Sequence, residues 1–230
     1  MCCLAAFAAF EVCSCASPVL AVGLDAVDTG LVLAVDVSGS VDADRYRLQM
    51  AGIATAFEDP AVQDAILSGP RQSLLITLLQ WSDKAQISVP WTLIASAEDA
   101  LGFANKVRVA SRVASQFTCM SQMMRFVANK VLPRMPARSD RIVVDVSGDG
   151  RDNCNPRIPV DALRDELVAG RITINGLPIL EGNEAATLSQ WYRDHVIGGS
   201  GAFLLPARGF QDFARAVRQK FITEVSAAGR

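Results

Sequence analysis

The sequence lacks any run of basic residues that could form a binding surface for a polyanion. Its 230 residues include 22 lysines and arginines and 24 aspartates and glutamates, which are scattered along the chain and give a formal net charge of −2. Proteins that bind nucleic acid or anionic lipid chiefly through electrostatics concentrate positive charge on one face or in one segment. The composition therefore excludes nucleic acid from the partners that we expect.

Histidine and cysteine are scarce as well. His195 is the only histidine, no Gly-x-Ser-x-Gly sequence is present, and four of the six cysteines lie within the first 24 residues, which leaves Cys119 and Cys154. A serine hydrolase of the α/β type needs that nucleophile turn and a matched histidine. A tetrahedral zinc site needs more than two cysteines and one distant histidine. Neither kind of site is predicted.

Charge is almost absent from the start of the chain, where Glu11 is the only ionisable side chain besides cysteines before Asp25. Alanines and large apolar residues fill most of this segment, as is typical of a secretory signal peptide, although the usual basic start is missing. Residues 1–24 are therefore predicted to be a leader, and residues 25–230 an exported domain, periplasmic or secreted, without a transmembrane span. The sequence around Cys13 and Cys15 resembles a lipoprotein cleavage box, so a lipid on Cys15 is one alternative. An apolar helix packed on the domain is the other.

Half of the residues are hydrophobic, which is enough for one well-packed domain. Short β-branched runs alternate with segments of helical periodicity, and this alternation predicts an α/β fold with a doubly wound, mostly parallel sheet and helices on both faces. The predicted strands are 31–35, 73–81, 85–89, 141–146, 172–178 and 202–205. The predicted helices are 42–57, 61–67, 96–107, 119–131, 159–169, 184–194 and 210–225.

The loop after the first predicted strand carries a carboxylate and two hydroxyls at a spacing of two residues, in Asp36, Ser38 and Ser40. In a parallel sheet, ligands bind beyond the carboxyl ends of the strands, which is where this loop is expected. One carboxylate with neutral hydroxyls is a set of hard oxygen ligands that suits Mg²⁺ or Mn²⁺ better than Zn²⁺. The alternative is that Asp36 and Ser38 merely cap the next helix.

Asp-x-Ser-x-Ser after a buried first strand resembles the metal-ion-dependent adhesion site (MIDAS) of von Willebrand factor A domains, and the resemblance covers about residues 29–226. It implies that Asp36, Ser38 and Ser40 are ligands from the first loop, Thr118 a ligand from the second and Asp149 a ligand from the third. The second loop departs from the family, because bulkier residues replace the glycines that commonly flank the threonine. The segments 146–150, 174–179 and 196–199 resemble a narrower bacterial branch whose function is uncharacterised.

The resemblance also bears on the two remaining cysteines. Cys119 directly follows Thr118, and Cys154 lies five residues after Asp149. If both loops hold one ion, the two thiols should be neighbours, and in an exported chain we expect them to form a disulfide worth about 2–4 kcal/mol. Two unlinked thiols are the alternative.

The function implied by the resemblance is recognition without catalysis. Five protein oxygens, some acting through water, would leave one position on an octahedral Mg²⁺ open for an Asp or Glu carboxylate of an unidentified protein partner. An alternative is a Mg²⁺-dependent phosphohydrolase of the haloacid-dehalogenase type, which also has an aspartate after its first strand. Those enzymes need a second aspartate where Ser38 stands, and a downstream lysine, whereas Lys130 lies on a predicted helix. A structural domain with a decayed metal site is the third possibility.

Overall fold

A five-stranded sheet forms the centre of the molecule, in a computed structural model that describes residues 26–113, 115–154 and 157–226. The strand order is β3-β2-β1-β4-β5, and every neighbouring pair is parallel except β2 and β3. The strands are β1 (Ala26–Asp36), β2 (Leu74–Trp81), β3 (Ala85–Ile94), β4 (Arg138–Gly148) and β5 (Ile172–Pro178). The predicted α/β class and the mostly parallel sheet are confirmed.

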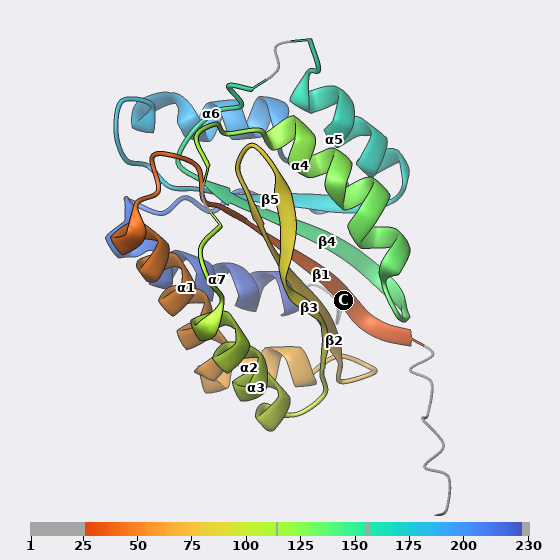
Figure 1. Ribbon diagram of the computed structural model, residues 1–230. Helices are drawn as coiled ribbons and strands as arrows, with labels where there is room; N and C mark the ends of the chain where they lie inside the picture. Colours follow the sequence, from red (N-terminus) through yellow and green to blue (C-terminus); the bar gives the residue numbers. More distant parts are fainter. Residues whose placement is uncertain (1–25, 114, 155–156, 227–230) are drawn as a thin grey trace, which may run out of the picture.

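Helices cover both faces of this sheet (Figure 1). One face carries α1 (Ala43–Glu58), α2 (Pro60–Leu67), α3 (Ala97–Val109) and α7 (Phe213–Ser226), and the other carries α4 (Met120–Phe126), α5 (Val160–Ala169) and α6 (Ala185–His195). Alternate residues of β1 point to opposite faces, so Leu33 packs toward α1 and α7 while Ala34 packs toward α4. Because both faces are buried, β1 needs a continuous apolar run, which is the pattern seen in the sequence.

Three helices on the face that also carries α7, namely α1, α2 and α3, begin at capping side chains. The carboxylate of Asp42 accepts the backbone N–H groups of Asp44 and Arg45 at the start of α1. Ser96 caps α3 in the same way. Such caps satisfy backbone donors that have no acceptor inside the helix.

Two predicted elements differ in the structure. Residues 202–205 were expected to form a strand, but they make only an isolated bridge from Leu204 to Gly176 at the edge of β5. Gly199 and Gly201 have positive φ values, which turn the chain away from an extended path just before this segment. The helix predicted over 119–131 is α-helical only to Phe126 and continues as a π-helical turn over Val127–Val131.

The predicted leader, residues 1–24, lies outside the described residues. Within the part of the chain that the structure describes, no helix is both long enough and apolar enough to cross a membrane.

The order in which the chain adds strands to the sheet reverses direction at β1. From β1 the chain passes to β2 on one side, whereas β4 pairs with β1 on the other side. The loops that leave the carboxyl ends of β1 and β4 therefore diverge, and a crevice at such a switch point is the usual ligand site of open α/β sheets. Asp36 is the last residue of β1 and Gly148 the last residue of β4.

An aromatic contact between α1 and α3 gives a test of the core. The Phe103 side chain is fully buried, and its ring centroid lies 4.8 Å from that of Phe57. Phe103→Ala should lower the free energy of unfolding by about 3–5 kcal/mol in urea denaturation, because it leaves a cavity. Leu101→Ala on the same helix is the matched control, since Leu101 is 45% exposed. Equal losses in the two variants would contradict this packing.

Candidate metal centre

The first loop is fixed from both sides around Asp36. The Asp36 side chain is fully buried, and its Oδ1 accepts the backbone N–H of Ser38 at 2.7 Å. Gln49 donates from Nε2 to the carbonyl of Asp36 at 3.1 Å, and the Arg112 guanidinium donates to the carbonyls of Ser38 and Val41. Because Asp42 caps α1, the alternative in which Asp36 and Ser38 do so is wrong.

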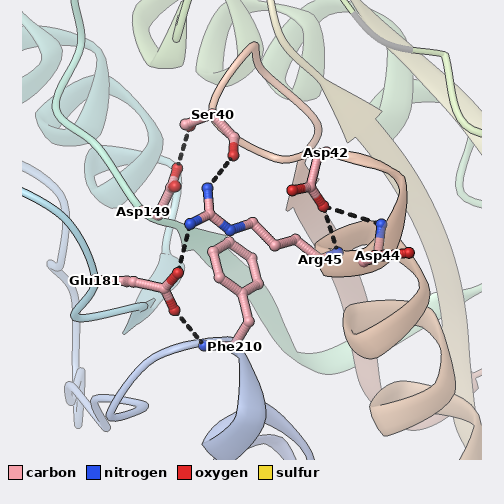
Figure 2. A network of polar contacts seen from close by, with 7 residues as sticks. All are labelled: Ser40, Asp42, Asp44, Arg45, Asp149, Glu181 and Phe210. Carbon is pink, nitrogen blue, oxygen red and sulfur yellow. Dashed lines mark hydrogen bonds and ion pairs between the residues drawn. The ribbon is translucent and has the colours of Figure 1, made fainter.

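The predicted ligands of the first and third loops form one chain of polar contacts. The hydroxyls of Ser38 and Ser40 lie 3.4 Å apart. Ser40 Oγ donates to Asp149 Oδ1 at 2.7 Å, a contact that Figure 2 shows. Thr118 lines, with Ser40 and Asp149, an open hollow of about 260 Å³. The structure therefore brings all five residues to the carboxyl ends of β1 and β4.

Two glycines permit the close approach of these loops. Gly39 donates its N–H to the carbonyl of Gln116 in the second loop at 3.2 Å, and a Cβ at Gly39 would lie 3.1 Å from that oxygen. At Gly148 a Cβ would lie 2.8 Å from Asp36 Oδ2 and 3.0 Å from the Tyr192 hydroxyl. Larger residues at these positions would push the loops apart.

The second loop is held by three consecutive residues that follow the third loop. Asp152 accepts the backbone N–H of Ser121 at 3.1 Å, which compensates for the lack of a side-chain cap on α4. Asn153 donates its N–H to the Thr118 carbonyl at 3.0 Å and accepts the Thr118 N–H on Oδ1 at 2.9 Å. Cys154 forms a disulfide with Cys119 that confirms the predicted bond. These contacts fix Thr118 from both neighbouring peptide groups.

The electrostatics of the site are those of buried acids. Burial raises the pKa of Asp36 from 3.8 to about 7, and the charge of Asp149 acts in the same direction. Burial also raises the pKa of Asp149, while the Ser40 hydrogen bond and the charge of Arg45 oppose that shift. Among the described residues, Asp36 Oδ2 is a buried oxygen without a hydrogen-bond partner. A buried anionic oxygen of this kind is costly unless a cation or a donor approaches it.

The donor set fits a hard divalent cation. Two carboxylates with the hydroxyls of Ser38, Ser40 and Thr118 offer only oxygen atoms, which Mg²⁺ and Mn²⁺ prefer. Within 26–113, 115–154 and 157–226, no group of three or more His, Cys, Asp or Glu residues could hold a metal ion. Hydroxyl oxygens must therefore complete any metal site at this position.

A fourth loop, after β5, reaches the same hollow, and sequence reasoning missed it. The Arg45 guanidinium donates to the Ser40 carbonyl at 2.5 Å, pairs with Glu181 Oε1 at 2.5 Å and lies 5.2 Å from the Phe210 ring centroid (Figure 2). Glu181 Oε2 accepts the Phe210 N–H at 3.1 Å. The position of Glu181 just after a parallel strand was the signal that could have identified it.

Solved structures of similar architecture define the class of the fold. The mussel byssus proximal thread matrix protein 1 with a zinc-occupied MIDAS motif aligns with a TM-score of 0.60 at 14% identity, over 89% of this chain and 48% of that chain. A von Willebrand factor type A structure from Catenulispora acidiphila aligns at 0.59 and 16%, over 88% and 43%. The von Willebrand factor domain of the type V pili tip protein Mfa5 from Porphyromonas gingivalis aligns at 0.59 and 9%, over 89% and 97%. The fold is that of a von Willebrand factor A domain.

The family is narrower than the fold. A family model matches residues 26–229, and the chain belongs to that family, a protein family of unknown function designated DUF1194. No curated protein matches the sequence. The chain spans less than half the length of the mussel and Catenulispora chains and nearly all of the Mfa5 domain. The resemblance and the uncharacterised branch predicted from the sequence are confirmed.

The buried carboxyl of Asp36 predicts how stability depends on pH without a metal ion. Its pKa is about 7 in the folded protein against an ordinary 3.8, so the folded state binds this proton more tightly than the unfolded chain. The contribution of protonated Asp36 to the free energy of unfolding is therefore fully present below pH 3.8 and is lost as the pH rises to about 7. In chelator, the wild type should lose up to about 4 kcal/mol of unfolding free energy relative to Asp36→Asn across this range.

Chemical denaturation at several pH values measures the difference. Asp64→Asn is the control, because Asp64 is an exposed aspartate of α2, and its profile should follow that of the wild type. If the profiles of wild type and Asp36→Asn are parallel, Asp36 is not a buried acid.

Proposed function

We propose that this chain is a protein-binding module that holds Mg²⁺ or Mn²⁺ at Asp36, Ser38, Ser40, Thr118 and Asp149 and presents the ion to a carboxylate of a protein partner. The observation that supports this most directly is the buried Asp36 Oδ2, which has no hydrogen-bond partner among the described residues. This oxygen belongs to the residue that begins the polar chain through Ser38 and Ser40 to Asp149.

A cation is the ligand that this arrangement favours. Burial disfavours the charged form of Asp36, and a second acid nearby disfavours it further. When bound, the ion supplies positive charge to both carboxylates and a site at which an outside oxygen can be held. The zinc-occupied MIDAS motif of the mussel protein supports divalent-metal binding in this fold. The all-oxygen donor set is our reason for proposing Mg²⁺ or Mn²⁺ in this chain.

The opening of the site supports recognition of an acidic group. Ser40 is exposed, and the residues that line the hollow beside it include Arg45 and Arg151 as well as Glu181 and Glu184. Arg45 is already paired with Glu181, so a cation bound at the site would supply the attraction for an incoming carboxylate. We therefore propose an Asp or Glu of the partner as the group that enters this hollow.

The surroundings argue against phosphoryl transfer. A haloacid-dehalogenase-type enzyme would need a second aspartate in place of Ser38 and a lysine beside the phosphate. The described residues that line the hollow include no lysine, and Lys130 lies in the π-helical turn Val127–Val131. We infer a non-enzymatic function, with no catalytic residue assigned.

The disulfide supports export. Disulfides persist mainly in oxidising compartments, and the apolar residues 1–24 have the composition of a leader. We propose that the domain, residues 25–230, works in the periplasm or outside the cell. The Mfa5 pilus-tip protein has the same fold and supports this setting.

Metal titration tests the ion site. The domain should bind Mg²⁺ or Mn²⁺ at one site in isothermal titration calorimetry, and Asp36→Ala should abolish binding while the protein stays folded. Asn153→Ala should weaken binding by about 10–100-fold, because it releases the backbone of Thr118 without removing a ligand. Asp64→Ala is the matched surface control. Equal binding by wild type and Asp36→Ala would refute the site.

Recognition is tested by partner capture and by an enzyme assay. Capture of a partner should require Mg²⁺, be lost in chelator and be lost when the key Asp or Glu of the partner is neutralised. Aryl phosphates and esters should not be hydrolysed. If turnover is found and disappears in Asp36→Asn, Asp36 is a nucleophile and the phosphohydrolase alternative replaces this proposal.

A further inference from the structure

A second cluster of charged side chains lies in the core between the sheet and α7, away from the metal centre. Lys220 and Glu224 come from α7 and Asp145 comes from β4. The exposed fractions of their side chains are 0%, 1% and 5%. Lysine and acidic residues are rarely buried so completely, and the proposed metal site does not use these three.

The three side chains meet at short distances. Lys220 Nζ lies 2.5 Å from Glu224 Oε1, to which it donates, and 2.7 Å from Asp145 Oδ1. The second contact is close but is not aligned as a hydrogen bond, since Asp145 Oδ1 has no hydrogen-bond partner in the described part of the chain. Asn175 donates from Nδ2 to Glu224 Oε1 at 2.7 Å, and the Phe203 ring centroid lies 4.9 Å from Lys220 Nζ.

Two cations lie near the two carboxyl groups of this cluster. Lys220 contacts both acids directly, whereas the partly buried Arg141 donates to the backbone carbonyl of Glu224 at 2.6 Å and interacts with the charge of Glu224. Burial and the charge of Glu224 raise the pKa of Asp145 to about 7, against the opposing effect of Lys220. Asp145 therefore holds a proton more tightly than an ordinary aspartate does. A buried ion pair is also costly in itself, because both ions lose their hydration.

We propose that Lys220 and Asp145 become joined by an intramolecular amide bond in the folded protein, with Glu224 as the proton carrier. The bond would link α7 covalently to strand β4 of the sheet. This inference is independent of the proposed metal site and of its partner.

The reaction balances without any oxidant or cofactor. Glu224, as a carboxylate, takes a proton from the Lys220 ammonium, and the free amine attacks Cγ of the protonated Asp145. Glu224 returns that proton to the carboxyl oxygen and then accepts a second proton from the nitrogen. Glu224 then gives this proton to one hydroxyl, a C–O bond breaks as that oxygen leaves as water, and Glu224 finally takes the proton of the remaining hydroxyl, which becomes the amide oxygen. The ammonium, the neutral acid and the carboxylate thus become an amide, a water and a neutral Glu224.

Three features of the cluster favour this step. The fold holds Lys220 Nζ and the Asp145 carboxyl group in contact, so the two reacting groups do not have to meet by diffusion. The proton carrier touches the attacking nitrogen. The product removes the charges of Lys220 and Glu224 from a buried site where charge is disfavoured.

Peptide mapping of the reduced, purified full chain tests the bond. Trypsin cannot cleave after a modified Lys220, so the digest should contain residues 142–151 joined to residues 219–230. The branched peptide should weigh about 18 Da, one water, less than its two parts together. Separate peptides with cleavage after Lys220 would show a plain buried ion pair and overturn the proposal.

Two variants distinguish the amide bond between Lys220 and Asp145 from other modifications that release water. Lys220→Arg keeps the positive charge but should give unjoined peptides. An Asp149-Gly150 succinimide would also lose water within 142–151, but it would persist in Lys220→Arg and would not join two peptides. Glu224→Gln should leave Lys220 free, and a joined peptide in this variant would refute the role of Glu224. If either variant fails to fold, the wild-type digest still decides the proposal.

Discussion

The burial of one carboxyl group, that of Asp36 at the end of the central strand, is the constraint on which the rest of the site depends. Its backbone and its first oxygen are held by Gln49 and Ser38, whereas its second oxygen has no hydrogen-bond partner among the described residues. Gly148 leaves the space that this oxygen needs, with the Tyr192 hydroxyl on the same side. Such a group is unfavourable as a bare anion, and this cost is the basis of our proposal that a cation binds it together with the neighbouring hydroxyls and Asp149.

The sheet topology explains why distant segments complete this site. The loops after β1 and β4 part at the switch point, and the second loop is bound to the end of the third by Asn153 and the Cys119–Cys154 disulfide. Glycines usually flank the threonine in domains of this kind, whereas here these contacts fix its backbone. Arg45 then joins the first loop to Glu181 after β5, so contacts between side chains and backbone connect all four loops.

The sequence predicted much of the fold because strands buried on both faces and amphipathic helices have clear periodicities. It also predicted Asp36, Ser38, Ser40, Thr118 and Asp149 as ligand candidates, because their loops resemble the metal-ion-dependent adhesion site of von Willebrand factor A domains; their role as metal ligands stays a prediction. The strand expected at 202–205 was wrong, since positive φ at Gly199 and Gly201 is a backbone property that apolar composition does not reveal. The pairs Arg45–Glu181 and Lys220–Asp145 depend on contacts between distant segments, which no local pattern encodes.

Two sets of buried acidic residues in the described part of the chain thus differ in the groups that surround their carboxylates. Asp145 and Glu224 contact a lysine of α7, whereas Asp36 and Asp149 lie beside the hydroxyl groups of Ser38 and Ser40, and Asp149 also lines an open hollow. The most direct test of the account is anomalous diffraction from crystals grown with Mn²⁺. The account predicts one strong peak within about 2–2.5 Å of Asp36 Oδ2 and in contact with Ser38 and Ser40. No peak at this oxygen, in crystals with Mn²⁺ bound elsewhere or not at all, would contradict it.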